Sequence, residues 1–316
     1  MAKEALLFFL FQKTTVKILG KKKLIDFSKL KGKIFFDNKF IENSKAKIHA
    51  LNHSLHFSAS VFEGIAIYNK KPLFEEDHYK RLKKSAKILR LDFKLSSKKF
   101  SEINAKLIKF NIKSEGYIRP IIFRTSHSMS PDTSFCKSSL AIACWSWGTL
   151  FDKKSINLGI SKWPKLNKKI FPIEAKSSGS YQSSVISRID AKKKGFDDCI
   201  MLDNDHYVSE TTACNIFWIK KNVVYTPSTD SALNGITRQA VIRILKKEKI
   251  SCKIGKYVMK DILQADAVFL TGTAAEVQLV GKINKKKFNL NNSLFELIKK
   301  NYNSIKLKSP KSVNKS

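Results

Sequence analysis

The spacing of apolar and polar positions divides the chain into two blocks, separated by a polar joint at residues 149–155. In the first block, short apolar runs bounded by polar residues predict strands, and apolar residues recurring every three or four positions predict helices. The second rule applies to Tyr79, Leu82, Ala86 and Leu89, which fall on one helical face. The predicted elements are a hairpin over 33–41 with an Asp-Asn turn, strands over 58–68, 73–74, 117–124 and 139–147, and helices over 76–89 and 100–111.

The second block mixes strands and helices in the same way. A glycine at position 195 ends one predicted helix, and Gly235 and Thr237 open another. The predicted elements are strands over 156–161, 199–202, 207–208, 215–219, 223–225 and 267–271, helices over 182–194 and 238–247, and a helical turn over 261–265. The pattern predicts an α+β or α/β fold of two domains joined by a short loop.

The domain boundaries follow from the same pattern. We expect a small α+β domain over 32–148, an interdomain loop over 149–155 and a large domain over 156–305. Residues 1–31 are predicted to form an extension outside the fold, and the lysine-rich residues 306–316 a disordered tail. The N-terminal apolar run is too short to span a bilayer, and no small-residue cleavage site follows it, so neither a membrane span nor a signal peptide is predicted.

Composition changes this picture little, although the formal net charge of +34 is extreme. Such a charge first suggests a nucleic-acid-binding protein. Against that interpretation, 53 of the 60 basic residues are lysines, only 7 are arginines, and they are spread over the whole chain. Specific phosphate and base recognition favours arginine. We therefore expect no specific nucleic-acid partner, and weak non-specific binding at low salt only.

The cysteines and histidines argue against a disulfide framework and against a metal site. The five cysteines are odd in number and contain no Cys-x-x-Cys pair, which is typical of a reducing, cytoplasmic compartment. His49, His53 and His56 have no carboxylate or cysteine at metal-ligand spacing to complete them. We expect no metal.

Lys176 is unusual among the lysines because small residues surround it. It lies in the octapeptide Glu174-Ala175-Lys176-Ser177-Ser178-Gly179-Ser180-Tyr181. A lysine with small neighbours can be approached closely by a planar ligand, and a lysine that loses its proton can attack a carbonyl. The octapeptide alone is equally compatible with an ordinary surface-loop lysine.

A Schiff-base cofactor such as pyridoxal phosphate needs a lysine, a carboxylate for its ring nitrogen, a phosphate cradle and a site for the substrate carboxylate. Glu210 ends a predicted strand and is a candidate for the carboxylate, although an exposed glutamate there is equally compatible. Gly235-Ile236-Thr237 and Gly272-Thr273-Ala274 each place glycine and threonine where free N–H groups can meet an anion, or can simply cap a helix. Arg81 and Arg119 add positive charge, the second within an apolar strand.

These candidates occur together and in an order that resembles a known family. The chain resembles the fold-type IV pyridoxal-phosphate enzymes, and within them the branched-chain amino acid aminotransferases, over about residues 32–300. The final stretch in the following list is the most specific. The resembling stretches are Leu51–Phe57 with Ser60–Gly64, His78–Leu82 with Ser85–Leu89, Tyr117–Pro120, Ala175–Tyr181, Gly195–Asp198, Tyr207–Glu210, Gly235–Arg238 and Ala265–Val277.

The resemblance implies a role for each candidate and a large domain that binds pyridoxal 5'-phosphate. Lys176 would bind the cofactor as a Schiff base and then move the substrate proton, Glu210 would pair with the ring nitrogen, and Tyr181 would bind the ring hydroxyl. Further roles concern the phosphate and the substrate. Arg81, Ile236, Thr237 and Thr273 would hold the phosphate, Tyr117, Thr273 and Ala274 the substrate α-carboxylate, Arg119 the side-chain carboxylate of glutamate, and Phe62 and Trp147 an apolar side chain.

The reaction implied is transfer of an amino group between leucine, isoleucine or valine and 2-oxoglutarate, in a homodimer or larger homo-oligomer. Several positions depart from the family pattern. Ser180 replaces a usual asparagine, Thr211–Cys214 replaces a glycine-containing stretch, and Phe57 and Leu150 stand where tyrosines are common. These departures bear on the amino donor more than on the cofactor. A D-amino acid aminotransferase, an aminodeoxychorismate lyase and, more distantly, a basic nucleic-acid-binding protein remain as alternatives.

Overall fold

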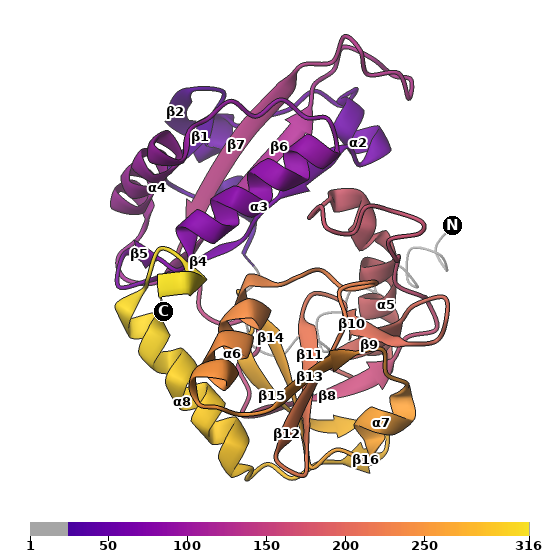
Figure 1. Cartoon of the computed structure of the whole chain (residues 1–316). Helices are drawn as coiled ribbons and strands as arrows, with labels where there is room; N and C mark the ends of the chain where they lie inside the picture. Colours follow the sequence, from indigo (N-terminus) through magenta and orange to yellow (C-terminus); the bar gives the residue numbers. More distant parts are fainter. Residues whose placement is uncertain (1–24, 316) are drawn as a thin grey trace, which may run out of the picture.

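The computed structural model describes residues 25–315 and arranges them around two β-sheets (Figure 1). The first sheet has the strand order β2-β1-β7-β6-β4-β5, with β3 paired to β6, and all its pairs are antiparallel. Its strands are β1 (Lys33–Phe36), β2 (Lys39–Glu42), β3 (Ser60–Phe62), β4 (Ile65–Tyr68), β5 (Lys71–Pro72), β6 (Gly116–Arg124) and β7 (Ser138–Trp145).

The second sheet has the order β10-β9-β8-β15-β14-β11-β12-β13, with β16 paired to β15. It is mixed, because β8 runs parallel to both of its neighbours and β12 runs parallel to β13. Its strands are β8 (Ser155–Ile160), β9 (Asp198–Leu202), β10 (Val208–Thr211), β11 (Asn215–Lys220), β12 (Val223–Pro227), β13 (Cys252–Gly255), β14 (Ala267–Gly272), β15 (Glu276–Ile283) and β16 (Lys286–Lys287).

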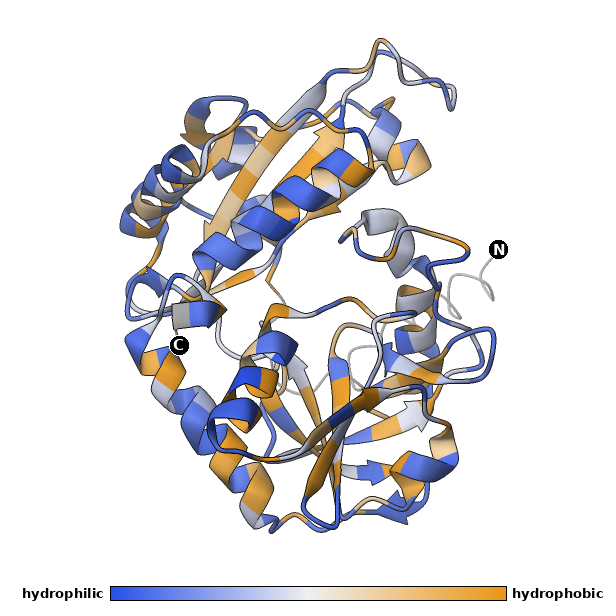
Figure 2. Cartoon of the chain, in the orientation of Figure 1, coloured by the Kyte–Doolittle hydropathy of each residue, from blue (hydrophilic) through white to orange (hydrophobic). Residues whose placement is uncertain are grey.

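The helices cover the sheets with their apolar faces turned inward, so their outer faces are mostly hydrophilic (Figure 2). Asparagine and serine side chains cap several of them; for example, Ser96 accepts the amide of Lys99 and Asn292 that of Phe295. The helices are α2 (His53–Phe57), α3 (Glu75–Ile88), α4 (Ser97–Asn111), α5 (Gln182–Lys193), α6 (Ile236–Lys247), α7 (Met259–Leu263) and α8 (Ser293–Lys308), with short 3-10 turns η1 (Phe27–Lys29), η2 (Asn43–Lys45), η3 (Ser178–Tyr181) and η4 (Val313–Lys315). Within residues 25–315, no helix is long and apolar enough to cross a membrane.

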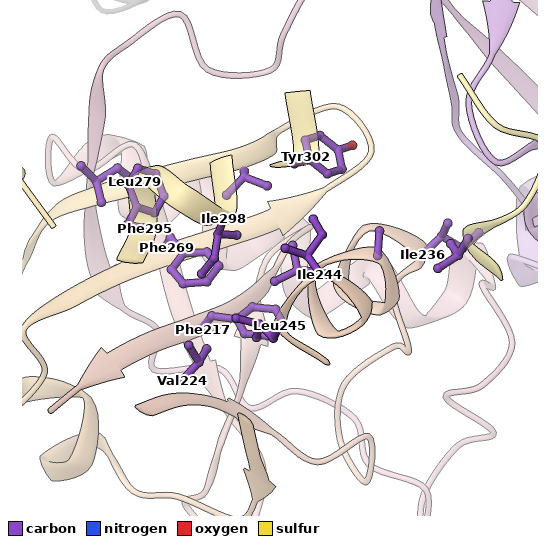
Figure 3. Packing of buried hydrophobic residues seen from close by; sticks show 14 of the residues in the cluster. Phe217, Val224, Ile236, Ile244, Leu245, Phe269, Leu279, Phe295, Ile298 and Tyr302 are labelled. Carbon is purple, nitrogen blue, oxygen red and sulfur yellow. The ribbon is translucent and has the colours of Figure 1, made fainter. Parts of the chain in front are cut away.

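A large apolar core lies between the second sheet and helices α6 and α8 (Figure 3). Phe217 and Phe269 stack there with ring centroids 5.1 Å apart, and Phe295 of α8 packs on Phe269. The same core includes Leu73 and Phe74, which lead from the first sheet into α3. Apolar packing therefore continues from one sheet to the other and fixes the elements that surround the site.

Most predicted elements of residues 25–271 are confirmed, with shifts of one to three residues at their ends. The predicted strand at 73–74 is wrong. Residues 71 and 72 form β5 instead, and Phe74 adopts a left-handed backbone conformation, with φ of 56°, that starts α3. Helices α2 and α8 and strands β13, β15 and β16 were not predicted.

Both predicted ends need correction within the described residues. Phe27, expected outside the fold, packs edge-on against Trp145, and its carbonyl accepts a hydrogen bond from Asn43. Residues 1–24 lie outside the described part of the chain. The predicted disordered tail is wrong from residue 306 onward, because α8 continues to Lys308 and buried Val313 joins the core. The division into two domains stays a prediction.

Candidate active site

Lys176 lies where the two sheets meet, in the segment between β8 and α5. Its main chain is fixed from the first sheet's side: its N–H donates to Ser85 Oγ at 3.0 Å, and its carbonyl accepts from the Phe62 N–H at 3.1 Å. Ser177 forms an isolated β-bridge with Val61, and its side chain caps the turn η3 that carries Tyr181. The small residues after Lys176 thus form a tight turn that sets its side chain against the tyrosine.

Lys176 is partly buried, and its Nζ donates to Tyr181 Oη at 2.5 Å. Loss of hydration around the amine, reinforced by the positive charge of Arg81, lowers the pKa of Lys176 to about 8, although Glu63 acts in the opposite direction. Loss of hydration likewise raises the pKa of Tyr181 to about 12, so the tyrosine keeps its proton near neutral pH. An amine with a lowered pKa is suited to attack a carbonyl.

Lys176 opens into a cavity of about 320 Å³. The cavity brings together three of the predicted residues, Lys176, Tyr181 and Glu210. Its lining residues are Lys165, Leu166, Ile173, Ala175, Lys176, Ser180, Tyr181, Glu210, Ser231 and Leu233.

Glu210 lies in β10 and is almost completely buried, with 7% of its surface exposed. Lys165 Nζ lies 3.0 Å from its Oε1 atom, and Asn215 Nδ2 donates to its Oε2 atom at 3.0 Å. Asn215 is itself held by the Leu233 carbonyl at 2.8 Å. A buried carboxylate needs such partners to stay ionised. The sequence prediction missed Lys165 and Asn215, and only the burial expected for a strand-end glutamate signals that partners exist.

Arg81 of α3 is held by Glu63, which is fully buried between β3 and β4. Its Nε and Nη2 atoms donate to the two Glu63 oxygens at 2.5 and 2.8 Å, and His78 Nδ1 lies 2.7 Å from Glu63 Oε2. Burial works to raise the pKa of Glu63, but Arg81 and His78 outweigh it, so that pKa lies well below its usual range. Arg81 Nη1 reaches the Asn234 carbonyl at 3.3 Å, just before α6. Arg81 therefore meets the start of α6, as the phosphate prediction requires.

The start of α6 has the geometry of an anion cradle. Gly235 is its N-cap, and a Cβ atom there would lie 2.1 Å from Asn215 Oδ1, so only glycine fits. Ile236 and Thr237 follow in the first turn, where helix N–H groups have no partner in the helix. Both are buried, and the Thr237 side chain hydrogen bonds with Tyr302 of α8.

A second cluster lies on β3, β6 and the end of β7. The Arg119 guanidinium lies 4.8 Å from the Phe62 ring centroid and 5.5 Å from that of Tyr117. Phe62 also contacts Tyr181 at 5.2 Å, and Trp147 meets Tyr117 edge-on at 4.9 Å. Arg119 Nε is buried with no hydrogen-bond partner. An unpaired buried guanidinium nitrogen beside aromatic rings fits an anionic ligand.

Thr273 and Ala274 lie apart from the lining of the 320 Å³ cavity, in the turn between β14 and β15. The Ala274 carbonyl accepts a hydrogen bond of 2.7 Å from the Leu150 N–H, so this turn contacts the predicted interdomain loop. No contact between these two residues and Lys176 is among those described for residues 25–315, and their roles stay predictions.

A comparison with known proteins matches residues 60–283 to the model of the family amino-transferase class IV. The chain belongs to this family. A "probable branched-chain-amino-acid aminotransferase" of Rickettsia bellii is 34% identical over 275 residues, which is 86% of this chain and 95% of that protein. This chain is thus a class IV aminotransferase of the fold-type IV group, as the resemblance implied.

Solved structures of class IV aminotransferases have the same fold. A branched-chain aminotransferase of Thermoproteus uzoniensis, crystallised with norvaline, has a TM-score of 0.84 and 29% identity and covers 88% of this chain and 95% of its own. A branched-chain amino acid aminotransferase from T.th., complexed with N-(5'-phosphopyridoxyl)-L-glutamate, has a TM-score of 0.82 and 28% identity, covering 89% and 95%. The fold prediction is confirmed.

Proposed function

We propose that this aminotransferase moves amino groups between leucine, isoleucine or valine and 2-oxoglutarate, with pyridoxal 5'-phosphate as its cofactor. The observation that carries the proposal is Lys176, whose pKa is lowered to about 8, in one cavity with Tyr181 and the carboxylate of Glu210. The names of the similar proteins support the substrate class, and the phosphopyridoxyl-glutamate bound to one of them supports the cofactor and glutamate as the amino donor.

The cofactor fits the residues present. Glu210 offers the ring nitrogen a carboxylate, and Tyr181 offers the ring hydroxyl a hydrogen-bond partner. Arg81 and the first N–H groups of α6, at Ile236 and Thr237, would hold the phosphate, with Thr273 as the further contact. Arg81 Nη1 already lies 3.3 Å from Asn234 O, next to those N–H groups. A fixed arginine and a helix N-terminus together suit a dianionic phosphate.

Lys176 is the group that moves the proton. Bound pyridoxal phosphate supplies an electron sink that stabilises negative charge on the substrate α-carbon. Lys176 Nζ takes the proton from that carbon as a base and returns it on the cofactor side, which its lowered pKa favours near neutral pH. Tyr181, 2.5 Å from Nζ, orients the amine.

The cluster around Arg119 is the proposed substrate site. Its unpaired Nε atom would meet the side-chain carboxylate of glutamate, and the rings of Phe62 and Trp147 would contact a branched apolar side chain. Tyr117 and the turn at Thr273 and Ala274 would receive the α-carboxylate. Alternate use of arginine and aromatic surface accounts for one site that accepts both an acidic and an apolar amino acid.

We further propose that the protein is a homo-oligomer, at least a dimer. Large apolar side chains of α2, α5 and their flanking segments are exposed on one side of the molecule (Figure 1). Contiguous exposed apolar surface of this kind suits association with a second copy. These side chains are Leu51, Leu55, Phe57, Val185, Ile186 and Ile189.

The test combines colour and substrate choice. Purified protein with added pyridoxal phosphate should absorb visible light, and borohydride treatment should fix the cofactor mass on Lys176 by peptide mass spectrometry. Lys176→Ala should bind no cofactor covalently, whereas the exposed control Lys169→Ala should behave as wild type. In a panel, leucine, isoleucine and valine should yield glutamate from 2-oxoglutarate. Activity confined to D-alanine, or pyruvate release from aminodeoxychorismate, would instead support the alternative enzymes.

A further inference from the structure

The cavity is lined by two lysines, Lys176 and Lys165, and the proposed function uses only the first. Lys165 has 7% of its surface exposed, and its Nζ lies 3.0 Å from Glu210 Oε1 and 2.9 Å from Ser184 Oγ. The same nitrogen lies 5.4 Å from the centroid of the Tyr181 ring. A buried cation is expensive to maintain unless it is paired, so its place beside one particular carboxylate needs a reason.

Lys165 is held from two sides. Its N–H donates to the Leu202 carbonyl at the end of β9, at 2.7 Å. Its Nζ donates to Ser184 of α5, and Ser184 in turn donates to Met201 Sδ at 3.7 Å. Main chain and side chain are thus both fixed, by β9 and by α5, which makes Lys165 a rigid point charge.

The charge state of Lys165 differs from that of Lys176. Burial works to lower the pKa of Lys165, but the nearby carboxylate of Glu210 outweighs it, so the pKa lies above its ordinary value. In Lys176, loss of hydration prevails and the pKa is lowered. One cavity therefore contains a permanently charged lysine next to Glu210 and a second lysine that can lose its proton.

Glu210 has bonding capacity left for a ligand. Lys165 engages Oε1 and Asn215 engages Oε2, each at 3.0 Å, and a carboxylate has about four lone-pair sites. A ring nitrogen that meets Glu210 would share one proton with it. The proton can sit on the nitrogen, leaving a carboxylate, or on the oxygen, leaving a neutral ring. A dry cavity alone favours the second, uncharged arrangement.

We propose that Lys165 is a positioning residue for Glu210: its ammonium group keeps the carboxylate ionised, and thereby holds the shared proton on the ring nitrogen of the cofactor. A cation at 3.0 Å stabilises the carboxylate and not the carboxylic acid. A protonated ring withdraws electrons from the substrate α-carbon, so Lys165 promotes the reaction without touching the substrate. The inference rests on the proposed function.

The test measures where that proton sits. Protein is loaded with pyridoxal phosphate labelled with ¹⁵N in the ring, and the ring-nitrogen resonance is compared among variants. Wild type should show the protonated shift, Lys165→Met should move toward the unprotonated shift and bind the cofactor about tenfold more weakly, and Lys165→Arg should restore both. Lys162→Met, which removes a lysine with 72% side-chain exposure three residues earlier, should match wild type.

The outcomes separate the two proposals. If wild type binds no labelled cofactor, the proposed function fails and the inference with it. If Lys165→Met binds the cofactor with an unchanged resonance, the inference alone fails and Lys165 only fills space. Should Lys165→Met not fold, the double variant Lys165→Met/Glu210→Gln is compared with Glu210→Gln. Because Lys165 acts through Glu210, these two should have the same resonance and affinity, and a difference between them would overturn the inference.

Discussion

Glu63 binds Arg81 through both carboxylate oxygens, at 2.5 and 2.8 Å, and no part of Glu63 reaches the surface. The pair joins the start of β4 to the middle of α3 and aims Arg81 at the start of α6. His78 completes the group at 2.7 Å from Glu63 Oε2. The arginine proposed to hold the phosphate is thus oriented before any ligand arrives, which reduces the entropy lost on binding.

Replacement of Glu63 by glutamine should therefore both destabilise the fold and weaken cofactor binding. The change leaves Arg81, whose side chain is only 13% exposed, beside a neutral amide, and loss of one partner of a buried pair costs about 3 kcal/mol of unfolding free energy. Denaturant unfolding and the cofactor dissociation constant measure the two effects. Glu102→Gln removes a carboxylate from an exposed pair with Lys99 and should change neither. A Glu63→Gln protein with wild-type stability and affinity would contradict the role of the pair.

The lowered pKa of Lys176 predicts how capture of an aldehyde depends on pH. The neutral amine is the nucleophile, so with a pKa of about 8 the rate should rise as pH passes through 8 and level off above it, well below the ordinary value of 10.5. Pyridoxal without phosphate is the suitable probe for cofactor-free protein. The charged and titratable groups facing the amine are Arg81, Arg119, Glu63, Tyr117 and His78.

A variant shows whether these neighbours cause the shift. Arg81→Met removes a positive charge that lowers the pKa of Lys176, so the midpoint of the pH profile should move upward. Because pyridoxal has no phosphate, loss of the proposed phosphate contact does not confuse the result. A wild-type midpoint close to the ordinary lysine value of 10.5 would mean that Lys176 is no more acidic than an exposed lysine.

Glu210→Gln should retain the cofactor but lose most aminotransferase activity. Glutamine keeps the shape of the side chain and the hydrogen bond with Asn215 can re-form through its amide, but it cannot hold the ring nitrogen protonated. Removal of a charged group that acts in the transition state lowers kcat more than it raises KM. Steady-state kinetics with leucine and 2-oxoglutarate measure the split. Normal turnover would remove the proposed role of Glu210.

The sequence is sufficient for the strands and for the candidate lysine, because both are local patterns. An apolar run marks β6, and small residues mark the turn after Lys176. The pairs that tune the site are not local: Lys165 meets Glu210, and Glu63 meets Arg81, only through folding. Nothing in the composition around Lys165 distinguishes it from the many solvated lysines of this chain.

The missed elements have physical reasons of their own. Helix α8 buries Phe295, Ile298 and Tyr302, whose spacing is helical, but lysines surround them and the apolar stripe is narrow. Strand β15 follows the glycine-containing turn at 272 closely, and its first residues resemble a continuation of that turn. The last residues of the chain are ordered mainly by backbone hydrogen bonds, which a lysine-rich composition does not reveal.

Those last residues lead to a final prediction, because they attach to the start of α3. The Phe74 N–H donates to the Pro310 carbonyl at 2.8 Å, and the Val313 N–H donates to Asp77 Oδ2 at 2.6 Å. Arg243 of α6 donates to the Asn314 carbonyl at 2.8 Å. The segment 309–315 thus ties α3, which carries Arg81, to α6, which carries the proposed phosphate cradle.

Asp77→Ala should release this segment. Loss of the hydrogen bonds to Val313 and Ser312 should cost about 1–3 kcal/mol of unfolding free energy and speed proteolysis after residue 308. Cofactor affinity should fall with it, since α3 and α6 are no longer tied together at this end. Leu307→Ala, at a side chain 74% exposed on α8, should leave stability, proteolysis and affinity unchanged. If Asp77→Ala loosens the segment while cofactor affinity stays at the wild-type value, the segment stabilises the fold without positioning Arg81.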